Sequence, residues 1–260
     1  MLVATWNVNS VKSRLDLLLR WLKEAQPDVV CLQEIKCVDD AFPTAEIEEA
    51  GYSSAVHGQK SYNGVALLSR LPLEDVTIGL AGEDEDEQAR FIEAAVSTAT
   101  GVVRIAGIYL PNGNPVDTLK YGYKLDWMER LRRHAETRLA LEEPFIIAGD
   151  FNVIPDARDA KRPETWVGDA LYRPETHAAW RRLTALGLTD ALRACADDAG
   201  LYTFWDYQAG AWQKNNGIRI DHLLLSAQAA DALTGVRIDS HVRAWERPSD
   251  HVPALAEFAF

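Results

Sequence analysis

The sequence predicts an α/β (α+β) fold in which two packed β-sheets are covered by helices on the outside, in a single domain over residues 1–260. Between residues 52 and 109 it shows only β-like runs, notably 64–70, 90–98 and 102–109. A doubly wound parallel sheet would need helices there. With 260 residues, of which 47% are apolar, the chain is long enough to bury a large core, and no linker or repeat marks a second domain.

The N-terminal part is expected to form a strand, a helix and a second strand. Residues 1–8 read as the first strand. Ser10 is a good N-cap, and the helix is expected over residues 10–25, because Pro27 blocks its continuation. Its apolar positions recur at helical spacing: Val11, Leu15, Leu18 and Leu22. Residues 28–33 form the second expected strand.

Helical patterns return later in the chain, within residues 117–141 and 174–186, with an apolar strand at 144–148 between them. The last third is again rich in strands. Residues 156–171 have little periodicity, so we expect a long loop there. A functional loop and a tolerated insertion remain equally open at that point.

The composition limits the classes of protein to which this sequence can belong. The formal net charge of −12 argues against general adhesion to nucleic acid, although carboxylates that hold a cation are partly neutralised. The acidic run 83–87 is expected to be a solvated loop tip, since it lacks the spaced ligands of a calcium loop. The N-terminus lacks the features of a secretion signal, and no apolar run approaches bilayer length. We expect a cytoplasmic protein whose three cysteines, Cys31, Cys37 and Cys195, are reduced.

Oxygen-bearing side chains gather at or just beyond the expected strand ends. They lie in four short segments, namely WNVN (6–9), QE (33–34), GDFN (149–152) and SDH (249–251). Residues i and i+2 of a strand point the same way, so Asp150 with Asn152, and Asn7 with Asn9, would present paired ligands. Taken one by one, each residue has an ordinary explanation as a cap or a surface group.

A metal ion explains the carboxylates of this set. Glu34 and Asp150 directly follow apolar runs, where a carboxylate is costly unless it is paired or bound to a cation. Carboxylate and amide oxygens without a cysteine cluster favour Mg²⁺, with Mn²⁺ as a substitute, over zinc.

Seven strings extend this pattern along nearly the whole chain: TWNVNSVKSR, LQEIK, GVALLSR, YLPNGNP, GDFNVIP, IRIDHLLLS and SDHVP. Together they resemble the successive signatures of the exonuclease III and abasic (AP) endonuclease family of the endonuclease/exonuclease/phosphatase superfamily. The resemblance implies a four-layer αββα sandwich of two mixed sheets, with the site where strand ends converge. It also implies DNA repair activity: metal-dependent cleavage at abasic sites and at 3′ ends.

The resemblance assigns a metal site to these segments. Glu34 matches the principal metal carboxylate, and Asn7 and Asp250 match residues in or near the coordination sphere. Asp150 matches the group that orients or deprotonates the attacking water, and it lies beside the metal together with Asn152.

The same resemblance implies a set of groups around the scissile phosphate. Asn152 matches an amide that binds this phosphate, Tyr109 matches a phenol directed at it, and Asn112 lies on the adjoining loop. His251 also faces the phosphate, and Asp221 matches the carboxylate that fixes the tautomer of this histidine.

The resemblance also implies contacts with double-stranded DNA that carries abasic sites or blocked 3′ ends. An abasic sugar swings out of the duplex easily, and an apolar pocket of Phe204, Ile218 and Trp205 would select it, although plain core positions are a serious alternative. Candidate contacts to the rest of the DNA are Asn9, Asn63, Lys36, Lys60, Arg90, Lys124, Lys214 and Arg219.

Two other functions compete with this interpretation. One is a regulatory paralogue that binds RNA or protein without catalysis, which should have lost ligands. The other is a phosphodiesterase or phosphatase of the wider superfamily that acts on a non-DNA substrate. The intact set of polar residues argues against the first, and the IRIDHLLLS and YLPNGNP strings argue against the second. We expect no organic cofactor, no membrane partner and a monomer.

Overall fold

Two mixed β-sheets form the centre of the protein in the computed structural model, which describes residues 1–82 and 86–260. The first sheet has the order β11 (Leu233–Ile238), β12 (Ala254–Phe258), β1 (Leu2–Asn7), β2 (Val29–Gln33), β4 (Val65–Ser69), β3 (Ser53–His57). The second has the order β5 (Leu73–Ile78), β6 (Phe91–Ser97), β7 (Val102–Tyr109), β8 (Phe145–Asp150), β10 (Asp221–Leu225), β9 (Thr189–Asp190). The pairs β1–β2 and β7–β8 are parallel, and the other neighbours are antiparallel.

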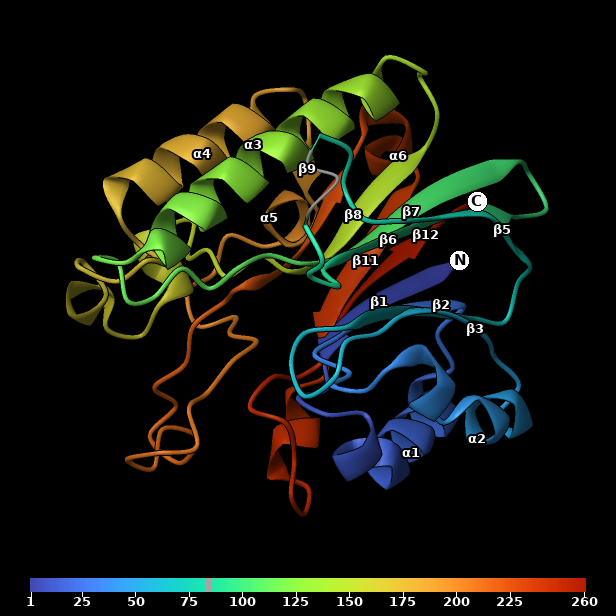
Figure 1. The fold of residues 1–260 in the computed structure, drawn as a ribbon, viewed down its shortest axis with the longest axis horizontal. Coiled ribbons are helices and arrows are strands. Elements are labelled where there is room, and N and C mark those ends of the chain that lie inside the picture. The colour runs from blue at the N-terminus through green and yellow to red at the C-terminus, as the bar shows by residue number, and fades with distance from the viewer. Residues whose placement is uncertain (83–85) are drawn as a thin grey trace.

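Helices cover the outer face of each sheet, so the order of layers is α, β, β, α (Figure 1). The helices α1 (Leu15–Ala25) and α2 (Thr44–Glu49) lie on one side, and α3 (Leu119–Leu139) and α4 (Pro174–Thr184) lie on the other. Two short helices and five 3₁₀ turns complete the described chain: α5 (Ala191–Cys195), α6 (Ala227–Asp231), Lys12–Arg14, Asp39–Ala41, Ala157–Asp159, Pro163–Thr165 and Ser240–Ala244. The four-layer sandwich expected from the sequence is confirmed.

Successive side chains along each strand point to opposite faces of its sheet, and this alternation separates the core between the sheets from the cores beneath the helices. In β1, Val3 packs into the core between the two sheets, whereas Ala4 and Trp6 pack in the core beneath α1. The edge of Trp6 meets Trp21 of α1, with ring centroids 5.5 Å apart. A third core lies between the second sheet and the helices α3 and α4, where Trp127 is buried. The period of two that predicts strands therefore also assigns side chains to their layers.

The helix predicted over residues 10–25 is present, but its first turn differs from the expectation. The α-helix begins at Leu15, after the 3₁₀ turn Lys12–Arg14. Ser10 has φ +89°, and its hydroxyl accepts a hydrogen bond from the Ser13 amide at 3.3 Å. The hydrogen bond of Ser10 is therefore made to the 3₁₀ turn and not to the α-helix, and the residue that precedes this turn is Val11. The helix ends at Ala25, as Pro27 predicts.

The expectations for the loops are met in part. Residues 156–171 form a loop with two 3₁₀ turns, Ala157–Asp159 and Pro163–Thr165. In the acidic run, residues 83–85 lie outside the described residues. Asp86 is not solvated as expected, because its carboxylate is nearly buried and bonds to Arg130 at 2.7 Å. That ion pair ties the loop to α3.

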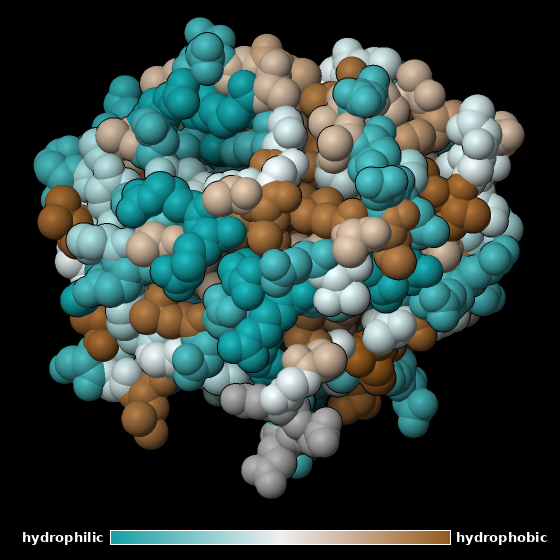
Figure 2. All heavy atoms as spheres, turned by 90° about the horizontal axis from the view of Figure 1, so that it is seen from above, coloured by the Kyte–Doolittle hydropathy of each residue, from teal (hydrophilic) through white to brown (hydrophobic). Residues whose placement is uncertain are grey.

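The face above α3 and α4 is mostly hydrophilic, and its apolar side chains occur in small separate groups (Figure 2). This is the outer surface expected of helices that bury their apolar side against a sheet. Among the described residues, no helix combines the length and the apolar character needed to cross a membrane.

Candidate active site

Strand direction brings the polar segments together at one edge of the two sheets. The parallel strands β1 and β2 end at Asn7 and Gln33, and the parallel strands β7 and β8 end at Tyr109 and Asp150. Strand β10 runs the other way, so its first residue, Asp221, pairs with Asp150. The carboxyl ends of parallel strands meet at one edge, which gathers residues that are far apart in the sequence.

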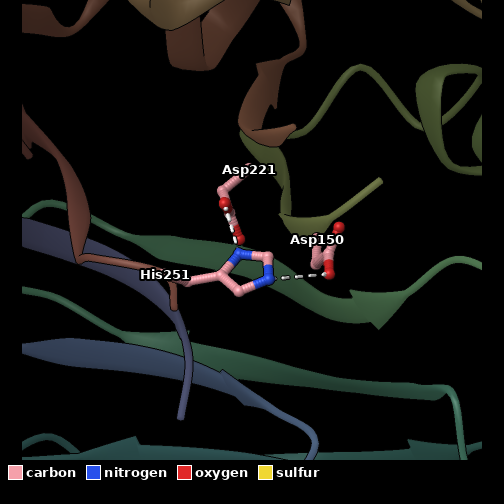
Figure 3. Close-up of side chains that lie close together, drawn as sticks. All are labelled: Asp150, Asp221 and His251. Carbon is pink, nitrogen blue, oxygen red and sulfur yellow. Dashed lines mark hydrogen bonds and ion pairs between the residues drawn. The ribbon is translucent and has the colours of Figure 1, made fainter. Parts of the chain in front are cut away.

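His251 lies between two carboxylates (Figure 3). Its Nδ1 lies 2.8 Å from Oδ2 of Asp221, and its Nε2 lies 3.7 Å from Oδ2 of Asp150. Burial opposes a charge on the ring, but the two carboxylates outweigh burial and raise the pKa of His251 well above its usual value. The imidazolium is therefore the form that fits this site at neutral pH.

Asp150 is buried and is held from two sides. Its Oδ2 accepts a hydrogen bond from the Asn7 amide at 3.0 Å, and its Oδ1 accepts one from the Asn152 backbone at 2.9 Å. Burial raises the pKa of Asp150, which His251 opposes and Asp221 reinforces. A carboxylate with a raised pKa is a stronger base than a solvated one.

Glu34 follows β2 in a strained backbone conformation, with φ +50°. Such left-handed residues are uncommon outside glycine and occur often at functional sites. Its Oε1 accepts a hydrogen bond from Asn7 at 2.8 Å, and its Oε2 pairs with Lys36 at 2.8 Å. Burial raises the pKa of Glu34, but Lys36 and Asn7 outweigh it, and the net pKa is lowered. Glu34 is thus held ionised.

Asn152 joins the loops that follow β7 and β8. Its Oδ1 accepts a hydrogen bond from Asn112 at 3.0 Å, and its Nδ2 donates to the Leu110 carbonyl at 2.8 Å. Tyr109 is partly buried beside Glu34. Burial, together with the negative charges of Glu34 and Asp150, raises the pKa of Tyr109 well above its usual value, so the phenol keeps its proton.

Asp250 lies at the rim of this cluster. Its Oδ1 accepts a hydrogen bond from the Asn9 amide at 3.0 Å, and the hydroxyl of Ser249 donates to the Asn7 carbonyl at 2.7 Å. The SDH segment is thereby tied to β1.

Comparisons with known proteins give this arrangement a family. The model of the endonuclease/exonuclease/phosphatase family matches residues 4–251. The chain belongs to this family. It is 34% identical to an exodeoxyribonuclease III from Haemophilus influenzae, over 98% of both chains.

Solved structures agree with this family assignment. An AP endonuclease from Archaeoglobus fulgidus superimposes with a TM-score of 0.95 at 34% identity and 100% coverage of both chains. A 3′ phosphatase from Neisseria bound to a product DNA hairpin superimposes with a TM-score of 0.96 at 38% identity, also over 100% of both chains. The resemblance drawn from the sequence strings is confirmed.

In this family member the charges suit a cation at Glu34. The amide of Asn7 reaches both Glu34 and Asp150, so the two carboxylates lie close together. Oxygen donors of this kind suit a hard divalent ion. The cluster Asp150, Asp221 and His251 also has ligand atoms within 4.8 Å of one another. Its histidine, however, faces a carboxylate at each nitrogen, with a hydrogen bond to Asp221 and an ion pair with Asp150, so we interpret the cluster as a charge-paired triad.

Two basic residues predicted to contact DNA are buried, and these predictions are wrong. Arg219 is 1% exposed, and its guanidinium pairs with Asp159 at 2.6 Å and with Asp190 at 2.8 Å. Lys124 is fully buried, and its Nζ donates to the Asn152 carbonyl at 2.6 Å. The sequence shows a positive charge, but burial removes that charge from the surface.

The predicted apolar pocket is corrected as well. Trp205 and Ile218 are each 2% exposed. Trp205 packs against Tyr202 and Trp212 and donates to Asn215, which makes it a core residue. Phe204 keeps exposed surface, and its ring lies 5.0 Å from that of His251. Of the three residues, Phe204 is the one able to touch a substrate.

Two polar residues predicted to contact DNA have structural partners near the site. Asn63 is nearly buried and donates to Gln59 at 2.8 Å, while its carbonyl accepts from the Lys36 amide. Asn9 accepts from the Lys36 side chain at 2.6 Å. Sequence reasoning missed Tyr207, whose hydroxyl accepts from Arg14 at 3.1 Å and donates to the Pro248 carbonyl. No local motif links these positions, so only folding reveals the contact.

Proposed function

We propose that this protein is a DNA-repair nuclease that hydrolyses phosphodiesters at abasic sites and at 3′ ends, with Mg²⁺ as cofactor and Mn²⁺ as a substitute. The observation that carries the proposal is the single cluster in which Glu34, Asn7, Asp150 and the imidazolium of His251 meet. The names of the relatives support the same activity, as an exodeoxyribonuclease III and an AP endonuclease.

Glu34 would hold the metal, with Asn7 and Asp150 beside it and Asp250 within the surrounding shell. When bound, the ion supplies charge stabilisation to the phosphate and to the leaving oxygen. The salt bridge with Lys36 at 2.8 Å supports this assignment, because it helps to keep the Glu34 carboxylate ionised.

The side chains of the protein supply the other steps of an in-line hydrolysis. Asp150 would take the proton from the attacking water, because its pKa is raised and its orientation is fixed by Asn7 and Asn152. His251, held by Asp221, would present a positive charge to the phosphate. Asn152 would bind a phosphate oxygen.

Tyr109 and Asn112 would complete the phosphate site from the loop after β7. Tyr109 keeps its proton and can donate a hydrogen bond. Asn112 orients the side chain of Asn152 by donating a hydrogen bond to its Oδ1 at 3.0 Å. These neutral donors suit a phosphate whose negative charge increases in the transition state.

Double-stranded DNA with an abasic site or a blocked 3′ end is the substrate that suits this site. Phe204 beside His251 offers an apolar surface to a sugar that lacks its base. The exposed rims of the loops carry the remaining DNA contacts, with Asn9 and Lys36 beside Glu34. We further propose that the protein acts as a monomer in the cytoplasm.

The test uses a labelled duplex with one internal abasic analogue, beside an undamaged duplex with a recessed end, each with Mg²⁺ and with chelator. Strong metal-dependent incision at the analogue is expected. A third duplex with a 3′ phosphate measures phosphatase activity, which the Neisseria neighbour motivates. If the folded protein cuts none of the three with either metal, a binding role or another phosphodiester substrate replaces this proposal.

A further inference from the structure

Lys124 is a buried cation that the proposed mechanism leaves unused. It lies in the second turn of α3, where neighbours such as Lys120 face solvent. Burying an ammonium group is costly unless hydrogen bonds compensate. Burial lowers the pKa of Lys124 to about 7, although Asp150 and Asp169 favour its charge. Because burying this ammonium group costs free energy, we expect the side chain to have a specific role.

Lys124 bridges two loops. Its Nζ donates to the carbonyl of Asn112 at 3.0 Å and to the carbonyl of Asn152 at 2.6 Å. The first loop follows β7, and the second follows β8. The side chains of the same two residues also meet, because Asn112 donates a hydrogen bond to Asn152 at 3.0 Å. The two loops are therefore joined through both backbone and side chains.

The Asn152 peptide connects this bridge to the proposed base. Asn152 has φ +48°, in the left-handed region, where asparagine is several-fold more common than most other non-glycine residues. Its backbone N–H donates to Oδ1 of Asp150 at 2.9 Å. The carbonyl and the N–H of Asn152 belong to successive peptide units that are joined at its Cα atom. A shift of the carbonyl therefore changes the backbone torsions of Asn152 and moves the N–H that holds the carboxylate of Asp150.

The loop after β7 is shaped around the lysine stem. Gly113 has φ +91°, and a Cβ atom placed there would lie 2.7 Å from Cδ of Lys124. A side chain at position 113 and the lysine in its present path exclude each other. Gly113 therefore leaves room for the stem of Lys124 beside this loop.

We propose that Lys124 is a positioning residue, which holds the carbonyls of Asn112 and Asn152 together and so orients the amide of Asn152 and the carboxylate of Asp150. This inference rests on the proposed nuclease function and adds a determinant of its rate. A buried lysine cannot contact the DNA backbone, so its removal should affect the chemical step and leave DNA binding unchanged.

The experiment compares Lys124→Met, which keeps the length and removes the ammonium, with Lys124→Arg and with the exposed control Lys120→Met. For Lys124→Met we expect kcat to fall about a hundredfold on the abasic duplex, while KM changes by less than about threefold. Lys124→Arg should recover at least about a tenth of the wild-type kcat, and Lys120→Met should match the wild type.

Three results would overturn the inference. An unchanged kcat in Lys124→Met is the first. The second is a raised KM with a shallower dependence on salt, which would mean that Lys124 contacts phosphate. The third is a loss of kcat that follows the melting temperature and that Lys124→Arg does not restore, which would mean a purely structural role.

A second measurement separates this inference from the proposed function. In protein labelled with ¹⁵N-asparagine, the side-chain amide signals of Asn112 and Asn152 should shift in Lys124→Met and stay in place in Lys120→Met. If the wild-type protein cleaves no DNA, the nuclease proposal fails, and these signals alone decide the inference. Unchanged signals would overturn it, and shifted signals would support it.

Discussion

Acidification from about pH 7 to about pH 4 should destabilise the protein through one buried histidine, His222. Its ring is fully buried next to Asp221, where Nδ1 accepts a hydrogen bond from Arg219 at 3.0 Å and Nε2 donates to the Val153 carbonyl at 3.0 Å. These partners fix the neutral tautomer. Burial, reinforced by the positive charge of Arg219, lowers the pKa of His222 to about 4.

The size and sign of the effect follow from this pKa. In the unfolded chain the same histidine titrates at about 6.5. As the pH falls below that value, the unfolded state binds a proton that the folded state does not, so the folded state loses stability. Each pH unit between the two values costs about 1.4 kcal/mol, which gives about 3 kcal/mol by about pH 4.

Urea unfolding at a series of pH values measures this loss. The comparison variant is His222→Gln, in which an amide can still accept from Arg219 and donate to the Val153 carbonyl but does not titrate. The other titrating groups are common to both proteins, so the difference between the two curves isolates His222. We expect the wild type to lose about 3 kcal/mol more than the variant between about pH 7 and pH 4. Parallel curves would refute the reasoning.

Four further predictions concern the site and its support. Asp150→Asn should lower kcat by about 10²–10⁴-fold, while the affinity for DNA measured by anisotropy stays nearly unchanged. Near-normal turnover of this variant would exclude Asp150 as the base. Glu34→Ala should weaken Mn²⁺ binding in calorimetry, and an unchanged isotherm would place the metal elsewhere. Binding to the abasic duplex should weaken steeply with salt despite the net charge of −12, whereas a flat dependence would contradict local phosphate contacts. Arg219→Met should cost about 3–5 kcal/mol of unfolding free energy, because it leaves Asp159 buried without this cation, and a loss below about 1 kcal/mol would contradict the buried pair.

Much of the fold follows from local pattern. A β-like run predicts β7 and a short continuous apolar run predicts β8, whereas the 3.6-residue period predicts α3 and α4. The start of α1 was less predictable. Ser10 is a good N-cap by type, but its left-handed backbone places it before a 3₁₀ turn. Its conformation depends on contacts made by the Glu34 segment, whose carbonyl accepts from the Ser10 amide.

In the candidate site, too, some features follow from the sequence and others only from the tertiary structure. The sequence by itself determined which polar residues end the strands, since Glu34 and Asp150 follow apolar runs and the family strings surround them. Only the tertiary structure decided which charges reach solvent. Lys124 and Arg219 are as basic in sequence as any surface residue, yet folding buries them against carbonyls and carboxylates. Burial depends on contacts between segments that are distant in the sequence, and the type of a residue alone does not reveal those contacts.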